Sequence, residues 1–216
     1  MENAAPSQPV ETPTLGRAPR AKPRERILRA ARTLFYEKGY ASVGINEVLQ
    51  EADAAKASFY QHFPSKEALI HACLDRDHHD AFEFKRRYVS DAKDPRERIL
   101  SVFDACMTFQ AEQNFRGCHF TNALAALHEN MPSIRELAAW HFASMMSFFE
   151  ELIVAWKIQA GLGEIDVACL ARALTSLLQG ATMTAQVELS QSAFEEGRNC
   201  ADAMLRCASE QIGKIF

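Results

Sequence analysis

The segment at residues 56–69, KASFYQHFPSKEAL, carries side chains that suit contact with DNA. A helix that enters the major groove needs small or short polar residues at its N-terminal end, and here these are Ala55, Lys56, Ala57 and Ser58. Donors suited to phosphate oxygens follow at Tyr60, His62 and Lys66. Phe59 and Phe63 point the other way, towards a small core. The pattern predicts a DNA-reading helix; the alternative is partly buried aromatic residues beside solvated lysines.

Three helices are expected to position these residues. An amphipathic helix with apolar residues three and four apart ends at Gly39. Two short helices, at about 45–51 and 55–62, follow and are joined by a turn in which Asp53 adopts a left-handed conformation. The two short helices must pack on the first, so residues 24–66 are predicted to form a helix-turn-helix domain.

The charge distribution favours a polyanion-binding role for the N-terminal part of the chain. The chain of 216 residues has a net charge of −4, yet residues 17–66 hold ten basic and five acidic residues. Residues 89–216 hold ten basic and sixteen acidic residues. A basic module on an acidic body is typical of a DNA-binding part attached to a part with another ligand, although a chance solvated face is the alternative.

The rest of the chain is predicted to be helical, which gives an all-α protein with about nine helices. Residues 1–23 contain five of the eight prolines and are expected to be a disordered arm, whose Arg17, Arg20 and Lys22 could add DNA contacts. Residues 67–216 are predicted to form an effector-binding and dimerisation domain, with helices at about 96–113, 118–129, 133–160, 166–190 and 193–214. No apolar run suggests a membrane span or signal peptide, and the six cysteines are scattered, so a cytoplasmic protein with reduced thiols is expected.

The stretch ILRAARTLFYEKGYASVGINEVLQEADAAKASFYQHFPSKEALI resembles the DNA-binding segment of the TetR family of bacterial repressors. The resemblance implies a homodimer that binds a near-palindromic operator and releases it when an inducer binds. By position, the residues that look base-facing are Asn46, Lys56, Ala57 and Gln61. Those that look backbone-facing are Gly44, Ser58, Tyr60, His62 and Lys66. Asp53, Ala55 and Ala57 depart from the residues common in the family, which leaves the operator sequence open.

Cys118 is the sharpest candidate for an effector or redox site. It begins a helix directly after a glycine, where unpaired backbone amides favour the thiolate. The Gly-Cys start resembles a TetR branch that responds to electrophiles or oxidants, some members of which pair the thiol with a lysine; here Gln186 occupies roughly that position. The alternative is that Cys118 is a packing residue. Other candidates to line a pocket, or simply to form core, are Cys106, Phe109, Trp140, Phe148 and Met183.

The last two helices are expected to form the dimer interface as a four-helix bundle. Small residues there allow close helix contact: Ala168, Ala171, Ala173, Gly180, Ala181 and Ala185. The alternative is that they pack within one chain.

Catalysis, cofactors and metals are not predicted. Cys118 and His119 are neighbours on a helix and point about 100° apart, so they do not suit a nucleophile and base pair. His71, Asp75, His78 and His79 share one helix face but are expected to be solvated. The remaining alternative to a DNA-binding regulator is a helical ligand-binding or protein-interaction module without a DNA role.

Overall fold

A computed structural model describes residues 21–210, and every regular element in that range is a helix, which confirms the predicted all-α class with nine helices. They are α1 (Pro23–Lys38), α2 (Ile45–Glu51), α3 (Lys56–His62), α4 (Lys66–Ser90), α5 (Pro95–Glu112), α6 (His119–Leu127), α7 (Ser133–Gln159), α8 (Val167–Glu188) and α9 (Ser192–Glu210). The predicted arm lies outside the described residues up to residue 20, including Arg17 and Arg20. The last four residues of the helix predicted at 193–214 also lie outside them.

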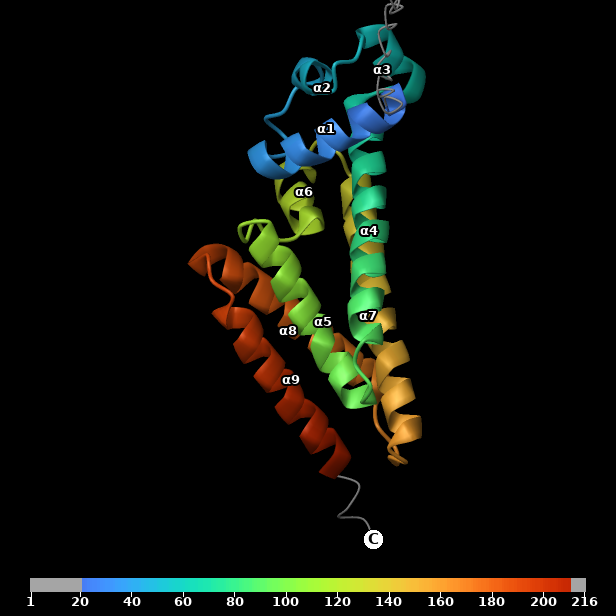
Figure 1. Ribbon diagram of the computed structural model, residues 1–216, viewed down its shortest axis with the longest axis vertical. Coiled ribbons are helices and arrows are strands. Elements are labelled where there is room, and N and C mark those ends of the chain that lie inside the picture. The colour runs from blue at the N-terminus through green and yellow to red at the C-terminus, as the bar shows by residue number, and fades with distance from the viewer. Residues whose placement is uncertain (1–20, 211–216) are drawn as a thin grey trace, which may run out of the picture.

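The helices α1, α2 and α3 gather at one end of the elongated molecule (Figure 1). Gly39 ends α1 with a φ of 92°, which favours glycine, and Asp53 turns the chain after α2 with a φ of 45°. Both turn predictions are confirmed. Phe59 and Phe63 are buried, so α3 is held by its apolar face.

The long helix α4 connects this end to the rest of the molecule (Figure 1). It begins at Ser65, whose Oγ accepts a hydrogen bond from the Ala68 amide at 3.1 Å, which is an N-cap. Helix α7 runs beside α4 and crosses nearly the whole length of the body.

Two hydrophobic cores fill the described part of the chain. The first joins α1, α2, α3 and the start of α4 to α6 and the start of α7, through residues such as Phe35, Leu69, Phe120 and Ile134. The second joins the C-terminal half of α4 to α5, α7, α8 and α9. The helix-turn-helix end therefore shares its core with α6, which lies next to the helices of the second core, called the body below. The domain limits of residues 24–66 and 67–216 remain predictions.

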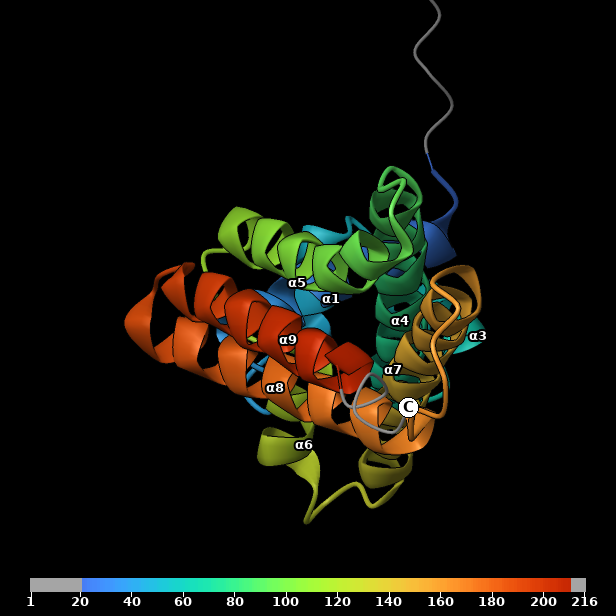
Figure 2. The same ribbon diagram turned by 90° about the horizontal axis from the view of Figure 1, so that it is seen from below.

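Helices α8 and α9 lie side by side as an antiparallel pair (Figure 2). A Cβ added to Gly197 of α9 would come 3.3 Å from the Cβ of Ala181, so the two backbones approach closely. Ala171, Ala181 and Ala185 are buried within the chain. Ala168 and Gly180, in contrast, face outwards. Over residues 21–210, none of the helices is long and apolar enough to cross a membrane.

Candidate DNA-binding and effector sites

The outer face of α3 is polar and exposed, while its inner face is apolar and buried. Lys56, Ala57, Tyr60, Gln61 and His62 are exposed, and Ser58 is half-buried. The ring of Tyr60 lies edge-on to the buried ring of Phe59, with ring centroids 5.1 Å apart, and this contact holds the exposed phenol in place. This arrangement can present donors to DNA without moving the core.

The residues predicted on either side of α3 also lie at the surface, with one qualification. Gly44 and Asn46 are exposed at the start of α2. Lys66 is half-buried, and its ammonium donates to the Ala41 carbonyl at 3.3 Å and lies 5.8 Å from the centre of the Phe35 ring. Burial lowers the pKa of Lys66. Lys66 therefore already stabilises the loop before α2, and its phosphate contact remains a prediction.

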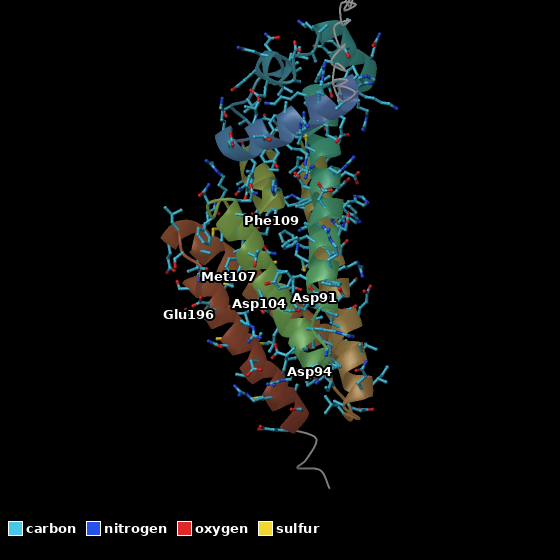
Figure 3. The ribbon with its side chains drawn as sticks, in the orientation of Figure 1. Asp91, Asp94, Asp104, Met107, Phe109 and Glu196 are labelled. Atoms are coloured by element: carbon cyan, nitrogen blue, oxygen red, sulfur yellow. The ribbon has the colours of Figure 1, made fainter. Side chains whose placement is uncertain are left out.

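A cavity of about 500 Å³ lies between α1, α4, α5, α6, α7 and α8. Its apolar wall includes Ala105, Phe109, Phe120, Met145 and Leu178. Phe109 lies on the half of α5 nearest the helix-turn-helix end (Figure 3). The volume of the cavity lies in the range of small-molecule sites, and its lining combines this apolar wall with many polar and charged side chains.

The loop between α5 and α6 forms the cavity wall that touches α1. The buried carbonyl of Gly117 accepts hydrogen bonds from Tyr36 Oη at 2.8 Å and from Gln110 Nε2 at 3.0 Å. The Gly117 amide donates to Gln110 Oε1 at 3.0 Å. Arg116 also donates to the Glu37 carbonyl at 2.8 Å. The C-terminal half of α1 is thus attached to the start of α6.

A charged cluster connects the same three helices. Asp77 of α4 lies 2.6 Å from Arg32 Nε of α1 and 3.1 Å from Nδ1 of His119 in α6, although that ring is not aligned for a hydrogen bond. His119 stacks on Tyr36 with ring centroids 3.9 Å apart. Burial raises the pKa of the Asp77 carboxyl, but His119 and Arg32 outweigh it and hold the pKa below its ordinary value. Asp77 is therefore a buried carboxylate shared by α1 and α6.

Five of the predicted effector residues line cavities. Cys106, Phe109 and Cys118 line the larger one, and Cys118, Met183 and Gln186 line a smaller one of about 120 Å³ beside it. Cys118 is half-buried at the N-cap of α6 and belongs to both. Burial raises the pKa of the Cys106 thiol.

Gln186 contacts the loop backbone. Its Nε2 donates to the Arg116 carbonyl at 3.0 Å, and a Cβ on Gly117 would lie 2.3 Å from its Oε1. Gln186 therefore holds the loop that precedes Cys118.

The other two predicted effector residues line neither of these cavities. Phe148 is buried in the core of the body, where its ring meets Phe82. Trp140 is 41% exposed and stacks on His78 with ring centroids 3.8 Å apart. Their role as effector contacts stays a prediction.

The sequence interpretation did not single out Tyr36, Asp77, Lys85, Gln110 or His141 as site residues, yet all five line the larger cavity. A signal existed for two of them. Asp77 and Lys85 share the inner face of α4 with Leu74 and Phe82, so they are charged residues at core positions. Tyr36 and Gln110 depend on contacts between distant helices, which no local pattern reveals.

The histidine face of α4 does not converge on one point. His71 Nε2 lies 2.9 Å from Ser133 Oγ, and His78 Nδ1 lies 3.1 Å from His141 Nδ1. Among the described residues, no group of three or more potential ligands is close enough to hold a metal ion.

Helices α2 and α3, joined by a short turn with α3 exposed, form a helix-turn-helix, and the remaining helices form a second part that holds a cavity. Residues 27–73 match "Bacterial regulatory proteins, tetR family", and residues 95–201 match "Tetracyclin repressor-like, C-terminal domain". The chain belongs to the TetR family.

Relatives and solved structures agree with this assignment. The chain is 32% identical to the transcriptional activator FasR of Mycolicibacterium smegmatis over 43% of this chain and 42% of FasR. It is 30% identical to the transcriptional repressor NemR of Escherichia coli over 57% of this chain and 65% of NemR. The chain thus spans less than two thirds of either relative.

A TetR-family regulator from Streptomyces coelicolor superposes with a TM-score of 0.76 at 26% identity, covering 87% of this chain and 90% of that one. The reduced form of NemR superposes with a TM-score of 0.71 at 22% identity, covering 84% and 96%. The second likeness concerns the fold alone.

Proposed function

We propose that this protein is a dimeric, DNA-binding transcriptional regulator whose affinity for a near-palindromic operator falls when an effector occupies or modifies the cavity region. The observation that carries the proposal is the exposed polar face of α3, held by the buried Phe59 and Phe63. The relatives include an activator and a repressor, and we favour repression because the NemR match is longer.

Binding to duplex DNA is the first test. The protein should shift promoter DNA next to its own gene in a gel, with an affinity that falls steeply as salt rises, because phosphate contacts release counterions. Lys56→Ala should weaken specific binding by about 1–3 kcal/mol, as expected for a base contact. Lys93→Ala, a loss of the same charge beyond α4, should leave binding unchanged. No shift at low salt would instead favour a helical module without a DNA role.

The effector part of the proposal rests on the attachment of α1 to the cavity wall. Tyr36 Oη binds the Gly117 carbonyl, and Cys118 is the next residue. A ligand in the larger cavity, or a group added to Cys118, would displace this loop and with it α1. Because α1 packs on α2 and α3, the distance between the helix-turn-helix units of the two subunits in a dimer would change.

Thiol modification can be tested directly. N-Ethylmaleimide forms a carbon–sulfur bond with the Cys118 thiol, and it should release the wild-type protein from DNA. Cys118→Ser should bind DNA but resist release. Cys169→Ser is the matched control, since Cys169 is exposed on α8, away from the loop, and this variant should be released like the wild type. Equal release of the Cys118→Ser protein would make Cys118 a packing residue.

The dimer is expected to form through the outer faces of α8 and α9. Gly180 is exposed on α8, and a Cβ there would meet no atom within 4 Å. Gly180→Arg should therefore fold, with a better helix propensity by about 1 kcal/mol, but should lose the dimer because the arginine would fill the contact. Light scattering should give a monomer mass for it and a dimer mass for Ala160→Arg, a control at the end of α7. A dimer with Gly180→Arg would place the interface elsewhere.

A further inference from the structure

Lys85 is a buried cation that faces the larger cavity without an acidic partner. Only 8% of the residue is exposed, and it lies on the inner face of α4. In the described part of the chain its ammonium has one hydrogen-bond acceptor, the Ala81 carbonyl one turn earlier, at the long distance of 3.5 Å. It also lies 5.4 Å from the centre of the Phe82 ring, a cation–π contact.

The acidic residues that line the same cavity are engaged elsewhere or lie at its rim. Asp77 and Asp80 both bind Arg32, each at 2.6 Å. Glu37 and Glu112 are exposed. Within residues 21–210, none of these four carboxylates comes within 4.0 Å of the Lys85 ammonium.

The surroundings of Lys85 offer no other charge to balance it. The same cavity is also lined by the apolar residues Ala105, Phe120, Met145 and Leu178. Burial and, to a smaller extent, the positive charge of Lys85 lower the pKa of the nearby His141 to about 2, so this imidazole is neutral. A buried ammonium is costly unless it is paired, and a neutral occupant of the cavity would leave it unpaired.

We propose that the larger cavity binds a small organic carboxylate, whose apolar body packs on Phe109, Phe120, Met145 and Leu178 and whose carboxylate pairs with Lys85. The volume of about 500 Å³ suits a fused two-ring or medium-chain acid. This inference rests on the proposed function only in taking the cavity as the effector site. It names the ligand class of that site.

Pairs of ligands that differ only in the charge of the carboxylate test whether that charge contributes to binding. Calorimetry at low salt would compare 2-naphthoate, indole-3-acetate and octanoate with their neutral amides on the full-length protein. Each amide keeps the apolar body and removes the charge. At least one acid should bind about 10- to 100-fold more tightly than its amide, the range expected for a hydrogen bond to a charged group in a buried site.

Two variants locate the effect. Lys85→Met keeps the apolar stem, and it should bind acid and amide alike. Lys93→Met removes an exposed lysine, and it should keep the wild-type preference. The proposal is overturned if no acid binds more tightly than its amide, or if a cooperatively folded Lys85→Met protein keeps the preference. The wild-type comparison decides the matter even where Lys85→Met fails to fold. Because DNA is absent from this assay, its failure is separate from failure of the gel shift.

Discussion

The buried carbonyl of Gly117 has two donors, and this predicts a non-additive loss of stability when both are removed. Tyr36→Phe removes the hydroxyl that donates at 2.8 Å, and the ring can still stack on His119. Gln110→Met removes the amide that donates at 3.0 Å and keeps a similar volume. The same Gln110 side chain also accepts from the Gly117 amide at 3.0 Å.

The expected magnitudes follow from which groups stay paired. In Tyr36→Phe the carbonyl keeps Gln110, so the unfolding free energy should fall by about 1 kcal/mol, the net value of one hydrogen bond. In Gln110→Met the carbonyl keeps Tyr36, but the buried Gly117 amide loses its acceptor, which costs about 1–3 kcal/mol. In the double variant the carbonyl itself is orphaned. This adds a further penalty, so the double loss should exceed the sum of the single losses by at least about 1 kcal/mol.

Urea unfolding of the four proteins, with a common m-value, gives the coupling energy. A second cycle combining Tyr36→Phe with Thr175→Val serves as the control, because Thr175 donates to its own helix at the Ala171 carbonyl, far from this loop. That cycle should be additive within about 0.5 kcal/mol. Additive losses for Tyr36 and Gln110 would mean that the two side chains do not share the Gly117 carbonyl, and the attachment of α1 to the cavity wall would need another explanation.

Three further predictions concern stability. His141 is neutral in the folded protein but takes up a proton in the unfolded protein below about pH 6.5, so the free energy of unfolding falls as the pH falls. In urea unfolding between about pH 5.5 and 4, His141→Gln should reduce this pH dependence by about 1.4 kcal/mol per pH unit. Gly117→Ala should cost more than Gly161→Ala in thermal unfolding. Both glycines have positive φ, but a Cβ at Gly117 would lie 2.3 Å from Gln186 Oε1, whereas one at Gly161 would meet no atom within 4 Å; equal losses would contradict the contact. Ser65→Ala should cost about 1 kcal/mol in the same assay through loss of the α4 N-cap, and an unchanged midpoint would show the cap to be dispensable.

The helix-turn-helix end was predictable from sequence because its constraints are local. Gly39 and Asp53 stand where the backbone must turn left-handed, and residue type alone signals this. Phe59 and Phe63 are four residues apart, so one helical period places both in the core. The regular spacing and breaks of the later helices were likewise readable, to within a few residues.

The cavity was predictable only in part, because it depends on how distant helices meet. Cys118 was found since its place after Gly117 is a local signal. Trp140 and Phe148 were chosen as aromatic residues on helices, but sequence does not say which face of a helix lines a cavity. The break at 114–117 was predicted, but the positive φ of Phe115 was not, because a phenylalanine gives no signal for that conformation.

The charged residues on the inner face of α4 join the two halves of the proposed mechanism. Asp77 holds α1 through Arg32, and Lys85 faces the cavity eight residues further along the same unbroken helix, about 12 Å away. An effector shifts DNA affinity only by the difference between its affinities for the DNA-bound and released conformations. A carboxylate bound to Lys85 would therefore change DNA affinity only if the position of α4 differs between the DNA-bound and released conformations. Asp77 would transmit such a displacement of α4 to α1 through Arg32. The same reasoning gives Cys118 a separate route through Gly117 and Tyr36, so a ligand and a thiol reagent would move α1 through different residues that line one cavity.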